Sequence, residues 1–178
     1  MSGKSGDRFS DQDMRQESLT SPRRLGLWIV ALVFVLDQAS KLWLLFGVRI
    51  AENGPYAVTP FMDIVLAWNR GISYGLFQQY SDLGRWLLVV VSFAAVIWLG
   101  RWLWNASGRL TVVSLALIIG GALGNGVDRA VYGAVVDFVH LYYRSFSWYI
   151  FNIADAAIVV GVIGLLYESL RPGAEKAA

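Results

Sequence analysis

Two aspartates at the outer ends of apolar stretches are the residues of this sequence best suited to chemistry. Asp137 lies in V-V-D-F, and Asp155 lies in F-N-I-A-D-A-A-I. A carboxylate in or beside a bilayer is costly, which makes each of them a candidate for a functional site. If the chain brings them together, one holds a proton while the other accepts one from water, so the pair supplies a general acid and a general base. The alternative is that they are two independent polar caps.

A third acidic residue and a lysine lie in L-D-Q-A-S-K, inside an apolar stretch. Asp37 and Lys41 are four residues apart, so they share one face of a helix. They either fix helix orientation or lie at the edge of a site. A Ser–Lys hydrolase that uses Ser40 is disfavoured, because adjacent residues point to different helical faces.

Further polar residues recur in three motifs. W-N-R-G-I-S-Y-G contains Asn69 and Gly71, where Asn can offer both a donor and an acceptor to a peptide backbone, although an ordinary turn is the alternative. Asn152 lies three residues before Asp155, on the same helical face. The motif G-G-A-L-G-N-G-V-D-R has glycines that allow close helix packing and polar residues suited to bracing neighbouring segments. Its relevant members are Gly121, Asn125, Asp128 and Arg129.

Composition places these residues in a membrane protein. The chain has 178 residues, of which 56% are hydrophobic and only 16% are charged, whereas soluble domains carry about 25% charged residues. A net charge of +2 with scattered Arg argues against nucleic-acid binding. The absence of Cys and the single histidine, His140, argue against thiol nucleophiles and against a zinc site, and no cofactor is expected.

Four apolar stretches are long enough to cross a bilayer as helices: 25–46, 86–104, 110–127 and 151–170. The sequence therefore predicts an all-α membrane protein of one domain, 25–170, with four transmembrane helices. Residues 1–24 are polar and are expected to form a disordered cytoplasmic tail, and residues 171–178 are expected to form a cytoplasmic tail at the other end of the chain. Placing both termini in the cytoplasm puts nine Lys and Arg residues inside and five outside, which agrees with the positive-inside rule.

The outer connections are expected to carry the remaining structure. Residues 47–85 contain turn signals and alternating stretches at 59–66 and 72–77, which predict a small extramembrane β-sheet between the first and second helices. Residues 130–150 are rich in aromatics, which either anchor the chain at the membrane interface or contact a substrate.

Taken in order, these motifs resemble those of lipoprotein signal peptidase, also called signal peptidase II, over about residues 25–170. The resemblance implies a four-helix membrane aspartic peptidase with a small extramembrane sheet. Such an enzyme removes the signal peptide from bacterial prolipoproteins, just before a cysteine that carries diacylglycerol. It also implies an active site toward the periplasmic face of the inner membrane and inhibition by globomycin-type depsipeptides. Membrane lipid is an expected partner, and nothing in the sequence demands more than a monomer.

By position, the resemblance makes Asp137 and Asp155 the catalytic pair. It assigns Asn125, Arg129 and Asn152 to substrate positioning. The remaining motif residues are expected to support the site: Asp37, Lys41, Asn69, Gly71, Gly121 and Asp128. The stretch 72–74 is one of several variants of its motif and could tune the shape of the pocket.

Two other classes of function stay open at this point. A proton-coupled transporter or channel would use Asp37, Lys41 and Asp155 as a relay, although the sequence has no internal repeat. A membrane scaffold would use the polar motifs only to lock helices together. Flux across proteoliposomes would identify the first, and loss of stability rather than activity in Asp variants would identify the second.

Overall fold

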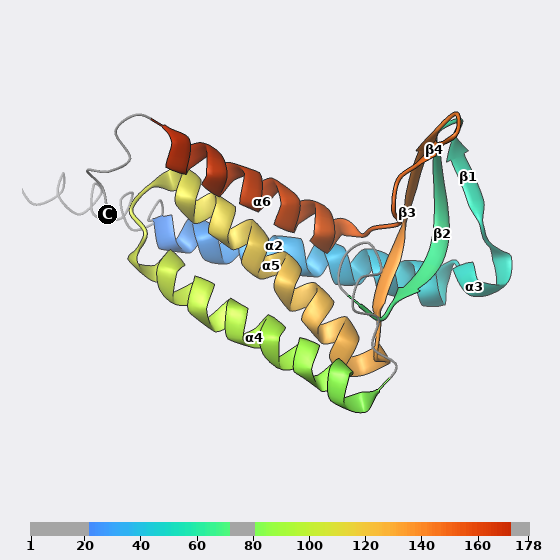
Figure 1. Cartoon of the computed structure of the whole chain (residues 1–178), viewed down its shortest axis with the longest axis horizontal. Coiled ribbons are helices and arrows are strands. Elements are labelled where there is room, and N and C mark those ends of the chain that lie inside the picture. Colours follow the sequence, from blue (N-terminus) through green and yellow to red (C-terminus); the bar gives the residue numbers. More distant parts are fainter. Residues whose placement is uncertain (1–21, 72–80, 172–178) are drawn as a thin grey trace, which may run out of the picture.

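The computed structural model describes residues 22–71 and 81–171, and within them the predicted membrane fold is confirmed (Figure 1). Four helices in these ranges are long and apolar enough to cross a membrane. They are α2 (Pro22–Leu42, continued by the π-helical turn η1, Trp43–Gly47), α4 (Asp82–Asn105), α5 (Arg109–Tyr132) and α6 (Ile153–Leu170).

The helix ends differ from the ends of the apolar stretches. α2 already includes Pro22, the first described residue, which lies inside the segment assigned to the N-terminal tail. Residues 1–21 and 172–178, which hold the rest of the two predicted tails, lie outside the described residues. α5 continues to Tyr132 and ends at Gly133, which has a φ of 77°, a left-handed conformation that glycine adopts without strain. Asp128 and Arg129 therefore belong to the last turns of a helix.

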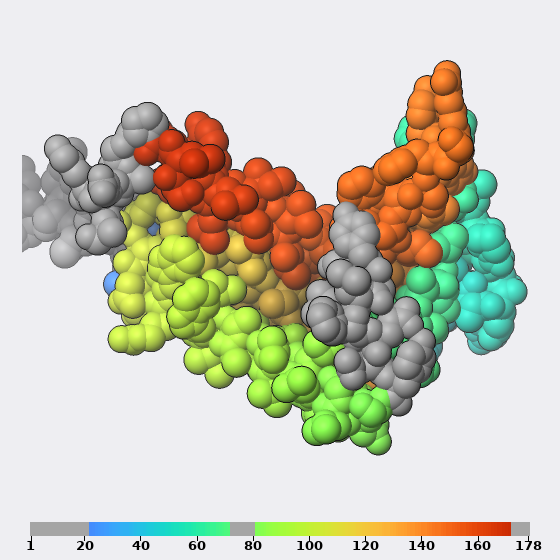
Figure 2. Space-filling view, viewed as in Figure 1, coloured from blue at the N-terminus to red at the C-terminus, as the bar shows by residue number. Residues whose placement is uncertain are grey.

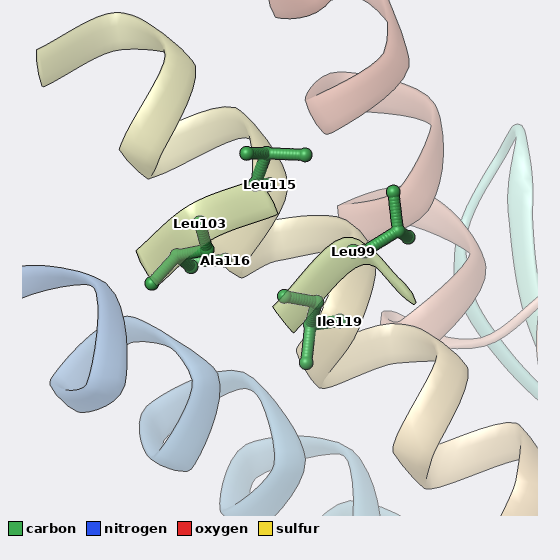
Figure 3. Close-up of a cluster of buried hydrophobic side chains, with 5 residues drawn as sticks. All are labelled: Leu99, Leu103, Leu115, Ala116 and Ile119. Carbon is green, nitrogen blue, oxygen red and sulfur yellow. The ribbon is translucent and has the colours of Figure 1, made fainter. Parts of the chain in front are cut away.

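α5 is the central helix of the bundle. In its most apolar 18-residue stretch 56% is buried, against 22% or less in the corresponding stretches of the other three spans, and α5 packs against α2, α4 and α6. A core cluster lies between α4 and α5 (Figure 3) and consists of Leu99, Leu103, Leu115, Ala116 and Ile119. Glycine lets neighbouring helices approach α5 closely, since a Cβ atom at Gly120 would lie 2.8 Å from Val33, and one at Gly121 would collide with the backbone of Ala154.

Large apolar side chains cover the outside of the bundle. Ile97 and Leu83 on α4 are 74% and 82% exposed, and Ile163 on α6 is 59% exposed. Patches of this extent on a soluble protein would be a liability. Facing lipid, they are the expected surface of a membrane span.

The small sheet is present, but both outer connections build it. In the described ranges it has four antiparallel strands in the order β1-β2-β3-β4, at one end of the bundle (Figure 1). The strands are β1 (Tyr56–Thr59), β2 (Met62–Asn69), β3 (Val135–Tyr143) and β4 (Phe146–Ser147), and the short helix α3 (Ile50–Asn53) precedes them. The predicted strand 59–66 falls on β2 after a turn at 60–61, whereas the predicted strand 72–77 lies outside the described residues.

β3 and β4 come from the segment whose aromatic content pointed to interface anchoring. β3 gives no alternating pattern, because its first four residues, Val135 to Phe138, are all buried. The β2–β3 register shifts between Ile64 and Ala67, so that Ala67 lies opposite Asp137. Bulges of this kind redirect side chains near functional sites.

Candidate active site

Asp137 and Asp155 meet through one residue, Asn152. Asp137 lies on buried β3, and Asp155 lies in the first turn of α6. The Asn152 side chain donates from Nδ2 to Asp137 Oδ1 at 2.6 Å, and its backbone N donates to Asp155 Oδ2 at 3.3 Å. The two carboxyl groups that the sequence singled out therefore share a hydrogen-bond partner at the end of the bundle that carries the sheet. A notch in the molecular surface separates α6 from the β3–β4 hairpin on one face of the molecule (Figure 2).

The sequence F-N-I-A-D places Asp155 by helix capping. Asn152 is the N-cap of α6, and its Oδ1 accepts from the backbone N of Asp155 at 2.9 Å, while Asp155 accepts from the backbone N of Asn152. This reciprocal capping box satisfies two backbone donors that a helix start leaves unpaired. It also fixes Asp155 at the positive end of the helix dipole, which stabilises a negative charge.

Asp137 is held by two amides in a nearly closed environment. Its side chain accepts from Asn152 at Oδ1 and from Asn69 Nδ2 at Oδ2, the latter at 3.1 Å. Burial, followed by the negative charge of Asp155, raises the pKa of Asp137 to about 7, although the two amide hydrogen bonds and the Lys41 cation oppose the shift. Asp137 can thus carry a proton near neutral pH, as a general acid must.

Asn125 connects the aspartate pair to a buried lysine. Its Nδ2 donates to Asp155 Oδ1 at 2.8 Å, while its Oδ1 accepts from Lys41 Nζ and from Asn152 Nδ2, each at 3.1 Å. An ammonium group can only donate, so Lys41 requires the Asn125 oxygen to face it. This leaves the Asn125 NH2 group to face Asp155.

The ion pair expected from the spacing of Asp37 and Lys41 is present and involves a third residue. Lys41 Nζ lies 2.7 Å from Asp37 and 2.8 Å from Asp128, and all three side chains are at most 2% exposed. Asp37 Oδ1 also accepts from the backbone N of Ala154 at 3.0 Å, and Asp128 Oδ2 accepts from that of Val136 at 3.1 Å. The triad therefore joins α2 and α5 to the residues next to the aspartate pair.

Ser40 does not contact this site in a way that a Ser–Lys hydrolase would require. Its hydroxyl donates to the Asp37 backbone carbonyl at 2.7 Å, one turn earlier on the same helix. Because that bond occupies the hydroxyl hydrogen, the geometry gives no support to Ser40 as a nucleophile.

Arg129, Gly71 and Asn69 tie the outer connection to α5. Arg129 Nη2 donates to the Gly71 carbonyl at 2.7 Å, and Nη1 donates to the Asn125 carbonyl at 3.3 Å. The backbone N of Gly71 donates to Asn69 Oδ1 at 3.0 Å, which turns the Asn69 NH2 group toward Asp137. Arg129 Nε is buried and has no hydrogen-bond partner among the described residues. The motif variant at 72–74 lies outside the described residues.

Three residues that contribute to this geometry were not among the site residues predicted from the sequence. Gln38 Nε2 donates to Asp128 Oδ1 at 2.9 Å and to Asp37 Oδ2 at 3.2 Å. Gly124 leaves room for Asp37, because a Cβ atom there would collide with the Asp37 carboxylate. Arg85 donates to the backbone carbonyls of Arg129 and Ala130 at the end of α5, at 2.9 and 2.6 Å. Gln38 and Gly124 lie inside motifs, whereas no sequence signal marks Arg85.

The residues that meet at this site are of the types that transfer protons. In residues 22–71 and 81–171, no group of three His, Asp or Glu side chains is arranged to hold a metal ion. Three amides, two cations and the two carboxylates that bind Lys41 surround the aspartate pair, and paired carboxyls are suited to exchanging a proton with water.

Comparison with known proteins gives one family. The profile described as Signal peptidase (SPase) II matches residues 29–171. A lipoprotein signal peptidase of Methylorubrum extorquens (strain PA1) is 60% identical over 149 residues, which cover 84% of this chain and 87% of the relative. One of Methylobacterium radiotolerans (strain ATCC 27329) is 56% identical over 156 residues, covering 88% of this chain and 91% of the relative.

Two solved structures of bacterial membrane enzymes match the fold of this chain. One described as "Bacterial membrane enzyme structure by the in meso method at 2.3 A resolution" has a TM-score of 0.72 and 26% identity, and covers 82% of this chain and 87% of that chain. A second, described in the same words at 1.9 Å, has a TM-score of 0.70 and 26% identity, with coverages of 83% and 93%. The family profile spans most of the sequence and includes every motif described above, so the chain belongs to the signal peptidase II family of membrane peptidases.

Proposed function

We propose that this protein is an aspartic endopeptidase that removes the signal peptide from diacylglyceryl-modified bacterial prolipoproteins and cleaves before the lipidated cysteine. One observation carries the aspartic part of the proposal: Asn152 hydrogen-bonds to both Asp137 and Asp155, so the two carboxyls belong to one site. The substrate follows from the family and from relatives named lipoprotein signal peptidase.

In the proposed reaction, a water molecule between the two carboxyls attacks the scissile carbonyl carbon. Asp155 takes the proton from this water, and protonated Asp137 gives its proton to the carbonyl oxygen, which forms a neutral tetrahedral intermediate. The C–N bond then breaks as the leaving nitrogen takes a proton from Asp155. Asp137 takes its proton back from a hydroxyl group of the intermediate, which becomes the new carboxyl group. No covalent acyl-enzyme forms, since water is the nucleophile.

This division of roles rests on the surroundings of each carboxyl. Asp155 accepts hydrogen bonds from Asn125 and from the Asn152 backbone at the start of a helix, and these donors offset part of the cost of burying a negative charge there. The pKa of Asp137 is raised to about 7, which favours its protonated form at neutral pH. The pair thus begins the cycle with one proton, as the reaction requires.

Substrate positioning is proposed for Asn125, Arg129 and Asn152. Each lies within one hydrogen bond of an aspartate of the pair or of its immediate partners. Arg129 Nε, a buried donor without a partner among the described residues, is suited to a substrate carbonyl. Lys41 acts one step further away, as a positioning residue that sets the orientation of the Asn125 amide.

The surrounding fold suits a lipid-anchored substrate. The apolar outer faces of the bundle would contact its acyl chains and its apolar signal helix, and the sheet could align its backbone by strand pairing. We place both termini in the cytoplasm and the site at the outer face of the inner membrane. The start of α2 and the end of α6 do lie together at the end of the bundle remote from the sheet (Figure 1).

The proposal is tested by incubating the purified protein with a diacylglyceryl-modified prolipoprotein and measuring product masses. We expect one cut, which leaves the lipidated cysteine as the new N-terminus and is blocked by a globomycin-type depsipeptide. In water labelled with oxygen-18, the released signal peptide should gain one labelled oxygen. The same precursor without the diacylglyceryl group is the matched control, and cleavage of both precursors at equal rates would refute the proposed substrate.

A further inference from the structure

At the end of the bundle remote from the sheet (Figure 1), the helix ends carry several exposed arginines. They lie at the start of α2, near the end of α4, at the start of α5 and just after α6. Among the described residues they are Arg23, Arg24, Arg101, Arg109 and Arg171. Glu168 is the single acidic residue of the described ranges near these ends. Within the described ranges, this end therefore carries a net positive charge where the spans end.

A groove of about 480 Å³ opens at this end between α5 and α6. Its lining residues are Arg109, Leu110 and Val113 of α5, with Glu168 and Arg171 at the end of α6. The Arg109 side chain is exposed and makes no ion pair or hydrogen bond to any described residue. Leu110 and Val113 lie inside the α5 span, so the groove has a charged rim and an apolar wall.

We propose that this groove binds an anionic phospholipid. The phosphate would lie between Arg109 and Arg171, where charge-assisted hydrogen bonds favour it, and the start of one acyl chain would run along Leu110 and Val113. A lipid fits better than free phosphate, because the apolar wall lies at acyl-chain depth and gives an inorganic ion no partner. The proposal does not depend on the chemistry at the opposite end of the bundle.

Glu168 opposes this binding and offers a way to test it. Its Oε2 lies 3.7 Å from Arg171 Nη1 and has no hydrogen bond within the described part of the chain. The carboxylate therefore competes with a phosphate for Arg171 and repels it directly. Replacement of Glu168 by Gln keeps the side-chain shape and removes the charge, so it should strengthen lipid binding.

The test measures lipid retention by the full-length protein. The protein is reconstituted in phosphatidylcholine nanodiscs that contain increasing phosphatidylglycerol, and bound lipids are counted by native mass spectrometry after release into detergent. We expect selective retention of phosphatidylglycerol, weakened about fivefold in Kd by Arg109→Ala or by Arg171→Ala, since one cation near a lipid phosphate contributes about that much. Glu168→Gln should lower the Kd by a similar factor.

Arg101→Ala is the matched control, because Arg101 is an exposed arginine at the same end that does not line the groove. It should leave retention unchanged. Equal weakening by Arg101→Ala would show a diffuse surface-charge effect and overturn the site. Equal retention of phosphatidylcholine, or complete displacement by millimolar inorganic phosphate, would also overturn it. Because prolipoprotein cleavage is not the readout, these results are independent of the proposed peptidase activity.

Discussion

The two ends of the helix bundle both carry charge, but they hold it in different ways. At the site end, Lys41 lies 2.7 and 2.8 Å from two carboxylates, and all three groups are at most 2% exposed. At the other end, Arg171 and Glu168 lie 3.7 Å apart, with side chains 59% and 31% exposed. Burying ions costs several kcal/mol that their attraction has to offset, whereas an exposed pair contributes about 0–1 kcal/mol.

This difference shows what the buried charges do. A pair needed only for stability could be apolar at lower cost. Here the same carboxylates accept from the backbone of Ala154 and Val136, the residues that precede Asp155 and Asp137 on their elements. We infer that the role of the buried charges at the site end is to fix the position of the aspartate pair.

Replacement of Lys41 by Met should give the largest effect on stability. It leaves Asp37 and Asp128 buried without a cation, which should lower the unfolding free energy by about 3–5 kcal/mol. Thermal unfolding in detergent micelles measures the loss. Arg171→Met removes the same charge at the exposed end and serves as the control. Equal small losses in the two variants would break the contrast between the two ends.

Replacement of Gly124 by Ala should be the next most harmful change. The new Cβ atom would collide with the Asp37 carboxylate, and overpacking of this kind costs about 1–3 kcal/mol. Gly126→Ala is the matched control on the same helix, because its Cβ atom would meet Ser92 at 3.4 Å, an ordinary contact. The unfolding temperatures of the two variants test this. A Gly124→Ala protein as stable as Gly126→Ala would show that Asp37 is not held as described.

The pH dependence of cleavage should reflect Asp137. Because its pKa is raised from 3.8 to about 7, the folded protein keeps this proton up to about pH 7 and loses it above. Catalysis needs one proton on the pair, so kcat/KM should fall by about tenfold per pH unit well above pH 7. The contribution of this group to stability should also decline as the pH rises from about 4 to about 7, since only the folded state retains the proton there. A rate that keeps rising to pH 9 would exclude protonated Asp137 as the acid.

The smallest effect should come from an exposed pair at the site end itself. Arg49 and Glu52 lie 3.9 Å apart, and both side chains are more than 60% exposed. Glu52→Gln should change the unfolding free energy by less than about 0.5 kcal/mol. Comparing its unfolding temperature with that of Lys41→Met distinguishes the effect of burying a charge from the effect of placing it at this end of the bundle. A loss above about 2 kcal/mol would mean that the location of a charge matters more than its exposure.

Local patterns were sufficient to predict the helices and much of the site. Apolar length gave the four spans, the i, i+4 spacing gave the Asp37–Lys41 pair, and the i, i+3 spacing placed Asn152 beside Asp155. The motifs also gave the family, which the comparisons confirm. The functions assigned to individual residues stay predictions.

Long-range contacts and fully buried strands could not be predicted in this way. The first four residues of β3 are buried, so they lack the alternation that marks a strand with one exposed face. Arg85 binds carbonyls about 45 residues away, a contact without a local signature. Gln38 lies in a motif, but a neutral amide between two carboxylates becomes informative only when the carboxylates are known to meet.

The most direct test of the central claim is the rate at which Asp137→Asn and Asp155→Asn variants cleave a diacylglyceryl-modified prolipoprotein. Asp63→Asn is the matched control, because Asp63 lies on the same sheet but bonds to Tyr142, away from the pair. We predict that Asp137→Asn and Asp155→Asn fold and insert into the membrane but cleave at least about 10²-fold more slowly, while Asp63→Asn keeps wild-type activity. Near-normal cleavage by either variant of the pair would contradict the account.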